Sequence, residues 1–283
     1  MKSQEHTLTF NVSVADREFI NKSSQPFQIM PAIPAVRSGV ATARTGWLTD
    51  KMIDSYMKSE CQHNILIHTS YITRVFSSKQ LTESLLQQYI KLAQKINTKY
   101  ILVHGPYSSK ECEFFDHGLE LLQKLTKENP EIKFVVEIPA FTKELIKKTD
   151  HILDFIDKYI GKIVKSGFEV VIDTAHTFNN CLSNEEVIGL VKAYNEHITW
   201  IHFNGNLNVQ ASKDRHCPMY DKNNLIQDPI KFTQELLKVV KPTTIFVSET
   251  IDNDIKKWIK FCENTGLTLV EKTVVNKIGD VIE

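Results

Sequence analysis

The chain has 283 residues, of which 42% are hydrophobic, and its 34 lysines and arginines balance its 34 aspartates and glutamates. This length and apolar content suffice for a large core in one or two domains. A formal charge of zero gives no long-range attraction for a polyanion, so binding of nucleic acid would depend on a local patch. Residues 1–11 lack the pattern of a secretory signal, and no apolar run is long enough to span a membrane. We therefore expect a soluble, intracellular protein with no membrane partner.

The cysteines are odd in number, scattered and without a CxxC pair, which argues against both a disulfide framework and a thiolate zinc site. They are Cys61, Cys112, Cys181, Cys217 and Cys262. This usage is typical of a protein from a reducing compartment.

Eight segments have the apolar pattern of buried strands. In chain order they are residues 8–14, 27–30, 65–68, 100–104, 134–137, 170–173, 200–202 and 245–249. Helical spacing of apolar residues separates most of them, over residues 81–96, 113–127, 142–164, 184–195, 229–240 and 253–264.

Local signals agree with these helices, because Ser183 or Asn184 can cap a helix start, Pro229 suits a first turn, and Gly266 follows a helix end. Eight strands alternating with helices, without a linker, predict one (β/α)8 TIM barrel of the α/β class over a doubly wound sheet. The predicted domain is residues 1–283. The apolar, strand-like tail from Leu267 has no assigned place in it.

Six of the predicted strands end on a side chain that can bind metal. These residues are His68, His104, Glu137, Asp173, His202 and Glu249. The carboxyl ends of barrel strands form one face, so their side chains converge there. His176 follows Asp173 by one short turn, and Asp214 and His216 form a further pair. The total is nine donors on one face.

A single histidine at a strand end is more often a hydrogen-bonded structural residue than a ligand, but five of the ten histidines lie at or just after strand ends. Nitrogen and carboxylate ligands without thiolate favour zinc, with manganese or iron as alternatives. Nine donors exceed the needs of one ion and indicate two or three metals, an arrangement that suits phosphoester hydrolysis.

Seven short motifs carry these donors. They are His-Thr-Ser-Tyr-Ile from His68, His-Gly from His104, Val-Glu ending at Glu137, Asp-Thr-Ala-His-Thr-Phe from Asp173, His-Phe-Asn from His202, Asp-Arg-His from Asp214, and Ser-Glu-Thr-Ile from Ser248. In these motifs the chain resembles the endonuclease IV family of apurinic/apyrimidinic (AP) endonucleases, which are trinuclear zinc enzymes on a (β/α)8 barrel.

The resemblance implies three Zn²⁺ per chain, with Mn²⁺ as an alternative at one site. The implied ligands are His68, His104 and Glu137 for the first ion, Glu137, Asp173, His202 and Glu249 for the second, and His176, Asp214 and His216 for the third. It also implies two catalytic residues, with Glu137 bridging two ions and Glu249 close to the attacking hydroxide.

The resemblance implies a monomer that acts on double-stranded DNA in base excision repair. The implied reaction is hydrolysis of the phosphodiester 5′ to an abasic site, which leaves a 3′-hydroxyl and a 5′-deoxyribose phosphate. Tyr71 and Ile72 match residues that wedge into the DNA. All five arginines follow a predicted strand, and guanidinium groups bind phosphate well. We expect phosphate contacts from four of them, namely Arg37, Arg44, Arg74 and Arg215.

The chain departs from the family in three places. Gly205 stands where the family has an aspartate, Cys217 to Tyr220 replace a glycine-containing turn, and the glycine-rich first loop is not found between Val14 and Ile20. Two alternatives stay open: a divalent-metal sugar isomerase or epimerase on the same architecture, and a metal-stabilised DNA-binding protein without turnover.

Overall fold

The computed structural model describes residues 6–12, 27–29, 54, 57, 64–70, 73–77, 81–250 and 254–269. Backbone contacts divide the chain into two compact units. Unit 1 contains residues 1–9, 107–109 and 137–283, and unit 2 contains residues 10–106 and 110–136. The prediction of one domain over residues 1–283 stays a prediction.

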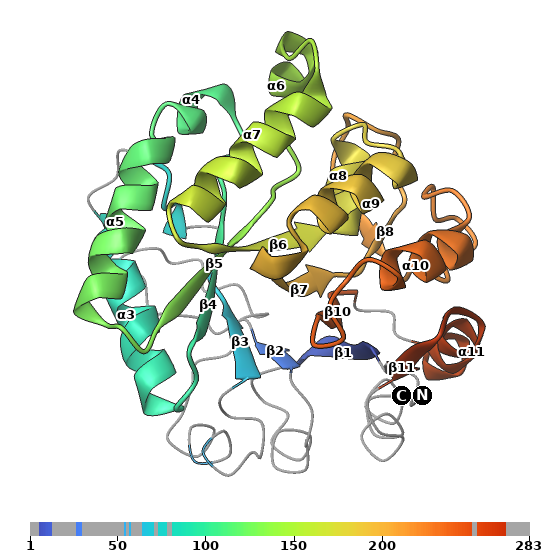
Figure 1. Cartoon of the computed structure of the whole chain (residues 1–283), viewed down its shortest axis with the longest axis horizontal. Helices are drawn as coiled ribbons and strands as arrows, with labels where there is room; N and C mark the ends of the chain where they lie inside the picture. Colours follow the sequence, from blue (N-terminus) through green and yellow to red (C-terminus); the bar gives the residue numbers. More distant parts are fainter. Residues whose placement is uncertain are drawn as a thin grey trace, which may run out of the picture. The chain divides into compact units, whose positions relative to one another are not determined.

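Unit 2 is built on parallel strands in the order β5-β4-β3-β2-β1. Its strands are β2 (Phe27–Ile29), β3 (Ile65–His68), β4 (Tyr100–His104) and β5 (Lys133–Glu137), of which the last residue, Glu137, belongs to unit 1. Its helices are α3 (Leu81–Lys95), α4 (Ser109–Cys112) and α5 (Phe115–Glu128). Strand β1 (His6–Val12) begins in unit 1 and pairs with β2 through its last residues. Helix α3 packs against β4 (Figure 1).

Unit 1 has β7 (Ile198–His202) paired in parallel with both β6 (Glu169–Asp173) and β10 (Ile245–Ser248). Its other strands are β8 (Gly205–Asn206), β9 (His216–Cys217) and β11 (Leu267–Leu269). Its helices are α6 (Lys143–Lys148), α7 (Ile152–Lys165), α8 (Thr174–Asn179), α9 (Asn184–Ala193), η3 (Asn195–His197), α10 (Pro229–Leu237) and α11 (Ile255–Thr265).

The strands form where the sequence has continuous apolar runs. Val170 and Val171 in β6 and Trp200 and Ile201 in β7 are fully buried. Strands of a parallel sheet are covered on both faces, so they lack the polar alternation of a half-exposed strand. This burial places the polar residue that ends each run at the edge of the core.

The predicted helix signals are confirmed. Ser183 caps α9 and forms a reciprocal capping box with Glu186, Pro229 lies in the first turn of α10, and Gly266 ends α11 with φ 88°. Only a residue without Cβ adopts this left-handed conformation at little cost.

Three elements differ from the prediction. The helix expected over residues 142–164 is two helices, α6 and α7, because the extended backbone of Thr149 ends α6. Strand β10 ends at Ser248, one residue before Glu249. At the start of the tail, which had no assigned place, Leu267–Leu269 form β11, which pairs in parallel with β1 in the register His6 to Leu267.

Besides the short helices α4 and η3, two short features were not predicted, the helix α8 and the antiparallel pair of β8 and β9. Both carry or flank predicted ligands.

Among the described residues, no helix has the length and apolar character needed to cross a membrane.

Candidate metal centre

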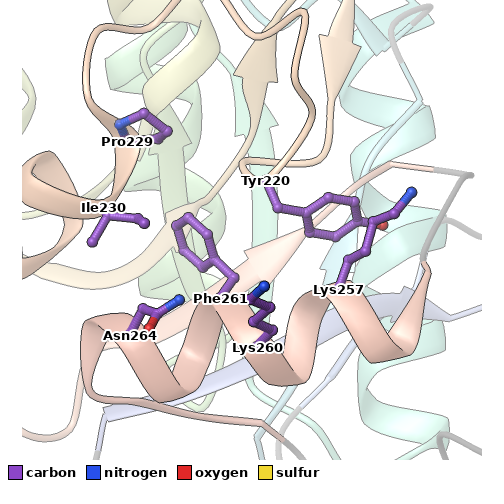
Figure 2. A pocket seen from close by; sticks show the side chains of 7 residues that line it. All are labelled: Tyr220, Pro229, Ile230, Lys257, Lys260, Phe261 and Asn264. Carbon is purple, nitrogen blue, oxygen red and sulfur yellow. The ribbon is translucent and has the colours of Figure 1, made fainter.

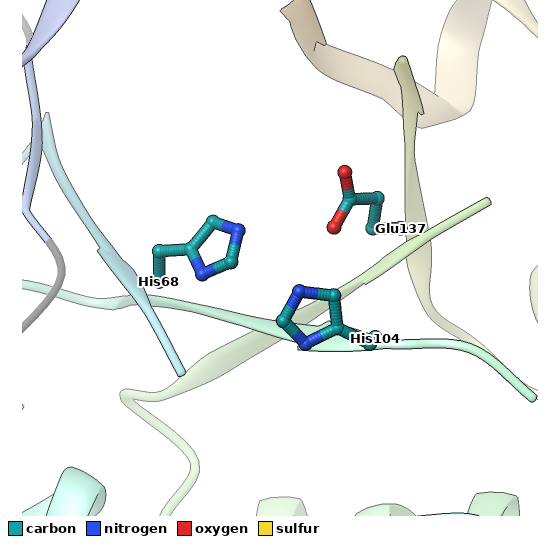
Figure 3. A group of neighbouring side chains, drawn as sticks. All are labelled: His68, His104 and Glu137. Carbon is teal, nitrogen blue, oxygen red and sulfur yellow. The ribbon is translucent and has the colours of Figure 1, made fainter. Parts of the chain in front are cut away.

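Two of the predicted ligands lie in unit 2, at the ends of neighbouring parallel strands. His68 ends β3 and His104 ends β4, and their ring centroids are 4.7 Å apart. The Nδ1 of buried His68 is 2.9 Å from the carbonyl oxygen of Thr69. A proton on Nδ1 would satisfy that carbonyl and leave Nε2 as the ligand atom. Figure 3 shows these two side chains side by side. Glu137 ends β5.

In unit 1, a first cluster gathers around His202. One ligand atom each from Glu137, Asp173, His202 and Glu249 lies within 4.8 Å of the others. The Nδ1 of His202 is 2.8 Å from Glu137 Oε1, 3.2 Å from Glu249 Oε2 and 3.8 Å from Asp173 Oδ2. The side chain of Glu249 is 10% exposed and those of the other three are almost fully buried, so Glu249 faces the solvent side of the cluster.

A second cluster in unit 1 joins His176 on α8, Asp214, and His216 on β9. Asp214 Oδ2 is 2.8 Å from His216 Nε2 and 3.3 Å from His176 Nε2. The Nδ1 of His176 is 3.0 Å from the carbonyl oxygen of Ile138, which directs Nε2 towards Asp214. His216 Nε2 is also 3.7 Å from Asp173 Oδ2, so the two clusters share Asp173.

Asp173 has a structural task as well as a place in the clusters. Its Oδ1 accepts hydrogen bonds from the backbone N–H groups of Ala175 at 2.7 Å and His176 at 3.1 Å. A carboxylate in this position caps a helix and interacts favourably with its positive end. The same side chain therefore ends β6, starts α8 and places His176 beside the cluster.

The charges around His202 favour its protonated form. Burial opposes the imidazolium, but the carboxylates of Glu249 and Glu137 outweigh burial and raise the pKa of His202 to about 9. A site that holds a proton this strongly is a site of negative potential.

The second cluster has the same character. Burial again opposes the imidazolium of His216, but Asp173 and Asp214 raise its pKa to about 9. Burial would raise the pKa of Asp214, yet its hydrogen bonds with His176 and His216 lower the pKa. Both clusters thus stabilise positive charge at their centres.

The residues present fit a divalent cation. Burying several carboxylates together costs about several kcal/mol for each charge that no cation compensates. In unit 1 the cluster of Glu137, Asp173, His202 and Glu249 and the group of Asp173, His176 and His216 present only imidazole nitrogens and carboxylate oxygens at short mutual distances. This donor set is typical of zinc and related metals.

Two asparagines that were not predicted as site residues contact the predicted ligands. The fully buried amide of Asn204 donates to Asp173 Oδ2 at 2.9 Å and to Glu249 Oε2 at 3.3 Å. The equally buried amide of Asn206 donates to Asp214 Oδ1 at 3.0 Å. The usable signal was their position, since Asn204 comes two residues after His202, the ligand that ends β7, and Asn206 comes two residues later.

Gly205, between these asparagines, is one of the departures from the family motif. A Cβ at this position would lie 2.6 Å from the side-chain amide of Asn224. Asn224 accepts a hydrogen bond from the backbone N–H of Asn206 at 3.1 Å and donates one to the carbonyl of Met219 at 3.0 Å. An amide from a later loop fills the space beside Gly205.

The predicted DNA contacts divide into two groups. Arg37, Arg44, Tyr71 and Ile72 lie outside the described residues. Arg74 in unit 2 and Arg215 in unit 1 are both exposed, and Arg74 has a positive φ of 26°. Their contact with phosphate stays a prediction.

Unit 1 also has a cavity of about 250 Å³ between α10 and α11 (Figure 2). Pro229, Ile230 and Phe261 form apolar walls, and the Nζ of Lys257 lies 5.8 Å from the centre of the Tyr220 ring. None of the nine predicted ligands lines this cavity, so it is separate from the two clusters.

Parallel βα units and buried clusters of histidine and carboxylate define an α/β protein with sites that could hold metal. The family model described as the xylose isomerase-like TIM barrel matches residues 53–250, which is more than half of the chain. The chain therefore belongs to the xylose isomerase-like TIM barrel family, and the predicted fold class is confirmed.

Solved structures agree with this fold. The protein in the crystal structure of AsfvAP:AG has 14% sequence identity to this chain. The TM-score is 0.64, and the match covers 97% of this chain and 99% of the other. A xylose isomerase domain containing protein from Salmonella typhimurium LT2 is 13% identical, with a TM-score of 0.58 over 99% and 97%. A D-tagatose 3-epimerase-like protein is 15% identical, with a TM-score of 0.54 over 97% and 100%.

The comparison with curated proteins found no match. The family match confirms the resemblance found in the motifs at the level of the family. Identities this low show a shared fold, while other similar structures are named for isomerases and epimerases.

Proposed function

We propose that this protein is a zinc-dependent AP endonuclease that hydrolyses the DNA phosphodiester 5′ to an abasic site. One observation carries the proposal: seven of the nine donors that match the endonuclease IV motifs gather in two clusters of unit 1, the first almost fully buried and the second half-buried. They are Glu137, Asp173, His176, His202, Asp214, His216 and Glu249. A structural role for each of them alone would not require that they meet.

The proposed ligands are those that the motifs imply. His68, His104 and Glu137 hold one Zn²⁺, Glu137, Asp173, His202 and Glu249 a second, and His176, Asp214 and His216 a third. When bound, zinc supplies Lewis acidity and lowers the pKa of water towards about 7. Manganese is the alternative at one site.

Glu137 and Glu249 have different proposed tasks because they differ in exposure. Glu137 is 1% exposed and its Oε1 is 2.8 Å from His202 Nδ1, which suits a bridging ligand deep in the site. Glu249 is on the solvent side, where its carboxylate can orient the attacking water and accept its proton. Fixed positive charge at the clusters would stabilise the phosphorane-like transition state.

The proposed substrate is double-stranded DNA with an abasic site, bound by a monomer. An abasic nucleotide has lost its base stacking, so moving it out of the duplex costs less than moving an intact one. Tyr71 and Ile72 are proposed to fill the gap, and Arg37, Arg44, Arg74 and Arg215 to contact phosphates.

The test uses a labelled duplex with one abasic site. We expect incision 5′ to the site, about three zinc ions per chain by elemental analysis, loss of incision on chelation and its return with Zn²⁺. A protein that holds metal and leaves this duplex intact would refute the nuclease.

A second candidate is a metal-dependent sugar isomerase or epimerase, favoured by the family description and by the similar fold of a D-tagatose 3-epimerase-like protein. Incubation of the metal-loaded protein with a panel of ketoses distinguishes the two, because an epimerase would change the sugar and leave the abasic duplex uncut.

A further inference from the structure

Two side-chain amides, from Asn204 and Asn206, reach predicted ligands from one short segment after β7. Asn204 is fully buried and contacts residues at the ends of two strands, β6 and β10. Its Nδ2 donates to Asp173 and Glu249, and its Oδ1 accepts the backbone N–H of Glu249 at 3.0 Å. The backbone N–H of Asn204 in turn donates to Thr174 Oγ1 at 2.9 Å. Asn204 therefore fixes both the backbone and the carboxylate of Glu249 relative to Asp173.

In the other cluster, Asn206 contacts only one of the two carboxylate oxygens of Asp214 among the hydrogen bonds that the structure describes. Its Nδ2 bonds to Oδ1 of Asp214, while Oδ2 of the same carboxylate faces His216 and His176 at 2.8 and 3.3 Å. The Oδ1 of Asn206 accepts the backbone N–H of Asn208 at 2.8 Å, which holds the amide in this orientation. One oxygen of Asp214 is thus occupied and the other is directed to the histidines.

An amide suits this task for a chemical reason. It is neutral, so it adds no charge to a cluster that already contains several carboxylates, and its N–H₂ group donates at any pH. A hydrogen bond to one oxygen of a ligating carboxylate fixes the orientation of the other, and loss of such a partner typically weakens metal binding by about 10- to 100-fold.

We propose that Asn204 and Asn206 are positioning residues of the metal centre, which hold Asp173, Glu249 and Asp214 in the orientation that metal binding requires. The inference rests on the metal-binding part of the proposed function and is independent of the substrate.

The test compares Asn206→Leu with Asn208→Leu in the whole chain of 283 residues. Both changes remove an amide of the same size, Asn206 from the end of β8 and Asn208 from two residues further on, but the side chain of Asn208 donates to the carbonyl of Lys213 and touches no predicted ligand. The probe is Co²⁺ added to chelator-treated protein and followed by its visible absorption, with circular dichroism as the check on folding.

We expect Asn206→Leu to bind at least one equivalent of Co²⁺ about 10- to 100-fold more weakly, with a shifted visible band. Asn208→Leu should match the unaltered protein. A folded Asn206→Leu protein with unchanged affinity and spectrum would overturn the inference.

If Asn206→Leu does not fold, Asn206→Ala replaces it with Asn208→Ala as the control, because alanine removes the N–H₂ donor of Asn206 and adds no charge. The same two results then decide. If the unaltered protein binds Co²⁺ but no variant differs, only this inference fails. If positioning is confirmed but abasic DNA stays uncut, only the proposed function fails.

Discussion

Glu249 is the carboxylate of the first cluster with the most access to solvent, and it is the residue on which the proposed chemistry most depends. Glu249→Gln keeps the size of the side chain and removes its charge and its ability to accept a proton. We expect affinity for abasic DNA to be retained and the single-turnover incision rate to fall about 10²- to 10⁴-fold, the usual contribution of a general base.

Fluorescence anisotropy with an abasic duplex measures the binding, and gel analysis of the labelled strand measures incision. Glu263→Gln is the control, because Glu263 is an exposed residue on α11. Unimpaired incision by Glu249→Gln would remove Glu249 from the mechanism.

Gly205 tests how tightly the segment of Asn204 and Asn206 is packed. A Cβ there would lie 2.6 Å from the Asn224 amide, so Gly205→Ala forces Asn224 from its hydrogen bonds. We expect the free energy of unfolding in urea to fall by about 1–3 kcal/mol. Gly189→Ala in α9, where the added Cβ meets nothing within 4 Å, should instead gain about 0.5–1 kcal/mol. Equal effects of the two changes would contradict the packing argument.

Residue types alone predicted the donors of the clusters, because histidine and carboxylate at the ends of apolar runs are few and chemically specific. They did not predict Asn204 and Asn206. Asparagine is common in loops, and only the folded chain shows that these two amides are buried against Asp173, Glu249 and Asp214.

At the scale of elements, the start of α9 depends on a reciprocal pair of hydrogen bonds. Ser183 Oγ accepts the N–H of Glu186 at 3.2 Å, and Glu186 Oε2 accepts the N–H of Ser183 at 2.7 Å. Ser183→Ala should lower the free energy of unfolding by about 0.5–2 kcal/mol. Urea denaturation measures this, with Ser166→Ala as the control, since Ser166 follows the end of α7, where its Oγ donates to the carbonyl of Lys162. An effect no larger than that of the control would show that the capping box adds little.

The long elements were predictable and the short ones were not. A buried strand such as β6 shows a continuous apolar run, and α9 has both its cap and its periodicity. The strands β8 and β9 have two residues each, which is too few for any period, and α8 begins because Asp173 accepts two backbone N–H groups. The division of residues 142–164 into two helices depends on the backbone of Thr149, which apolar spacing does not encode.

For the whole molecule, the buried carboxylates predict that metal stabilises the fold. A ligand that binds only the folded state adds about 4 kcal/mol when present at about 1,000 times its Kd. We expect chelation to lower the melting temperature in calorimetry and Zn²⁺ to restore it, while Mg²⁺, which prefers oxygen ligands, should not. Identical melting with and without chelator would argue against a metal centre.

The barrel class followed from the repeat of strand and helix, and the family match over residues 53–250 agrees with it. Repetition of this kind survives at identities of 13 to 15%, because parallel strands need only an apolar run and a following helix. The function of a barrel depends on its loops and ligands, so the fold leaves the reaction to be decided by the site.

The cap on α8 offers a way to observe the site without any substrate. The amide hydrogens of Ala175 and His176 are both held by Oδ1 of Asp173, whose other oxygen faces the histidines. Any rotation of that carboxylate would release both amides to solvent. Their rate of hydrogen–deuterium exchange is therefore an internal gauge of how firmly the carboxylate is held.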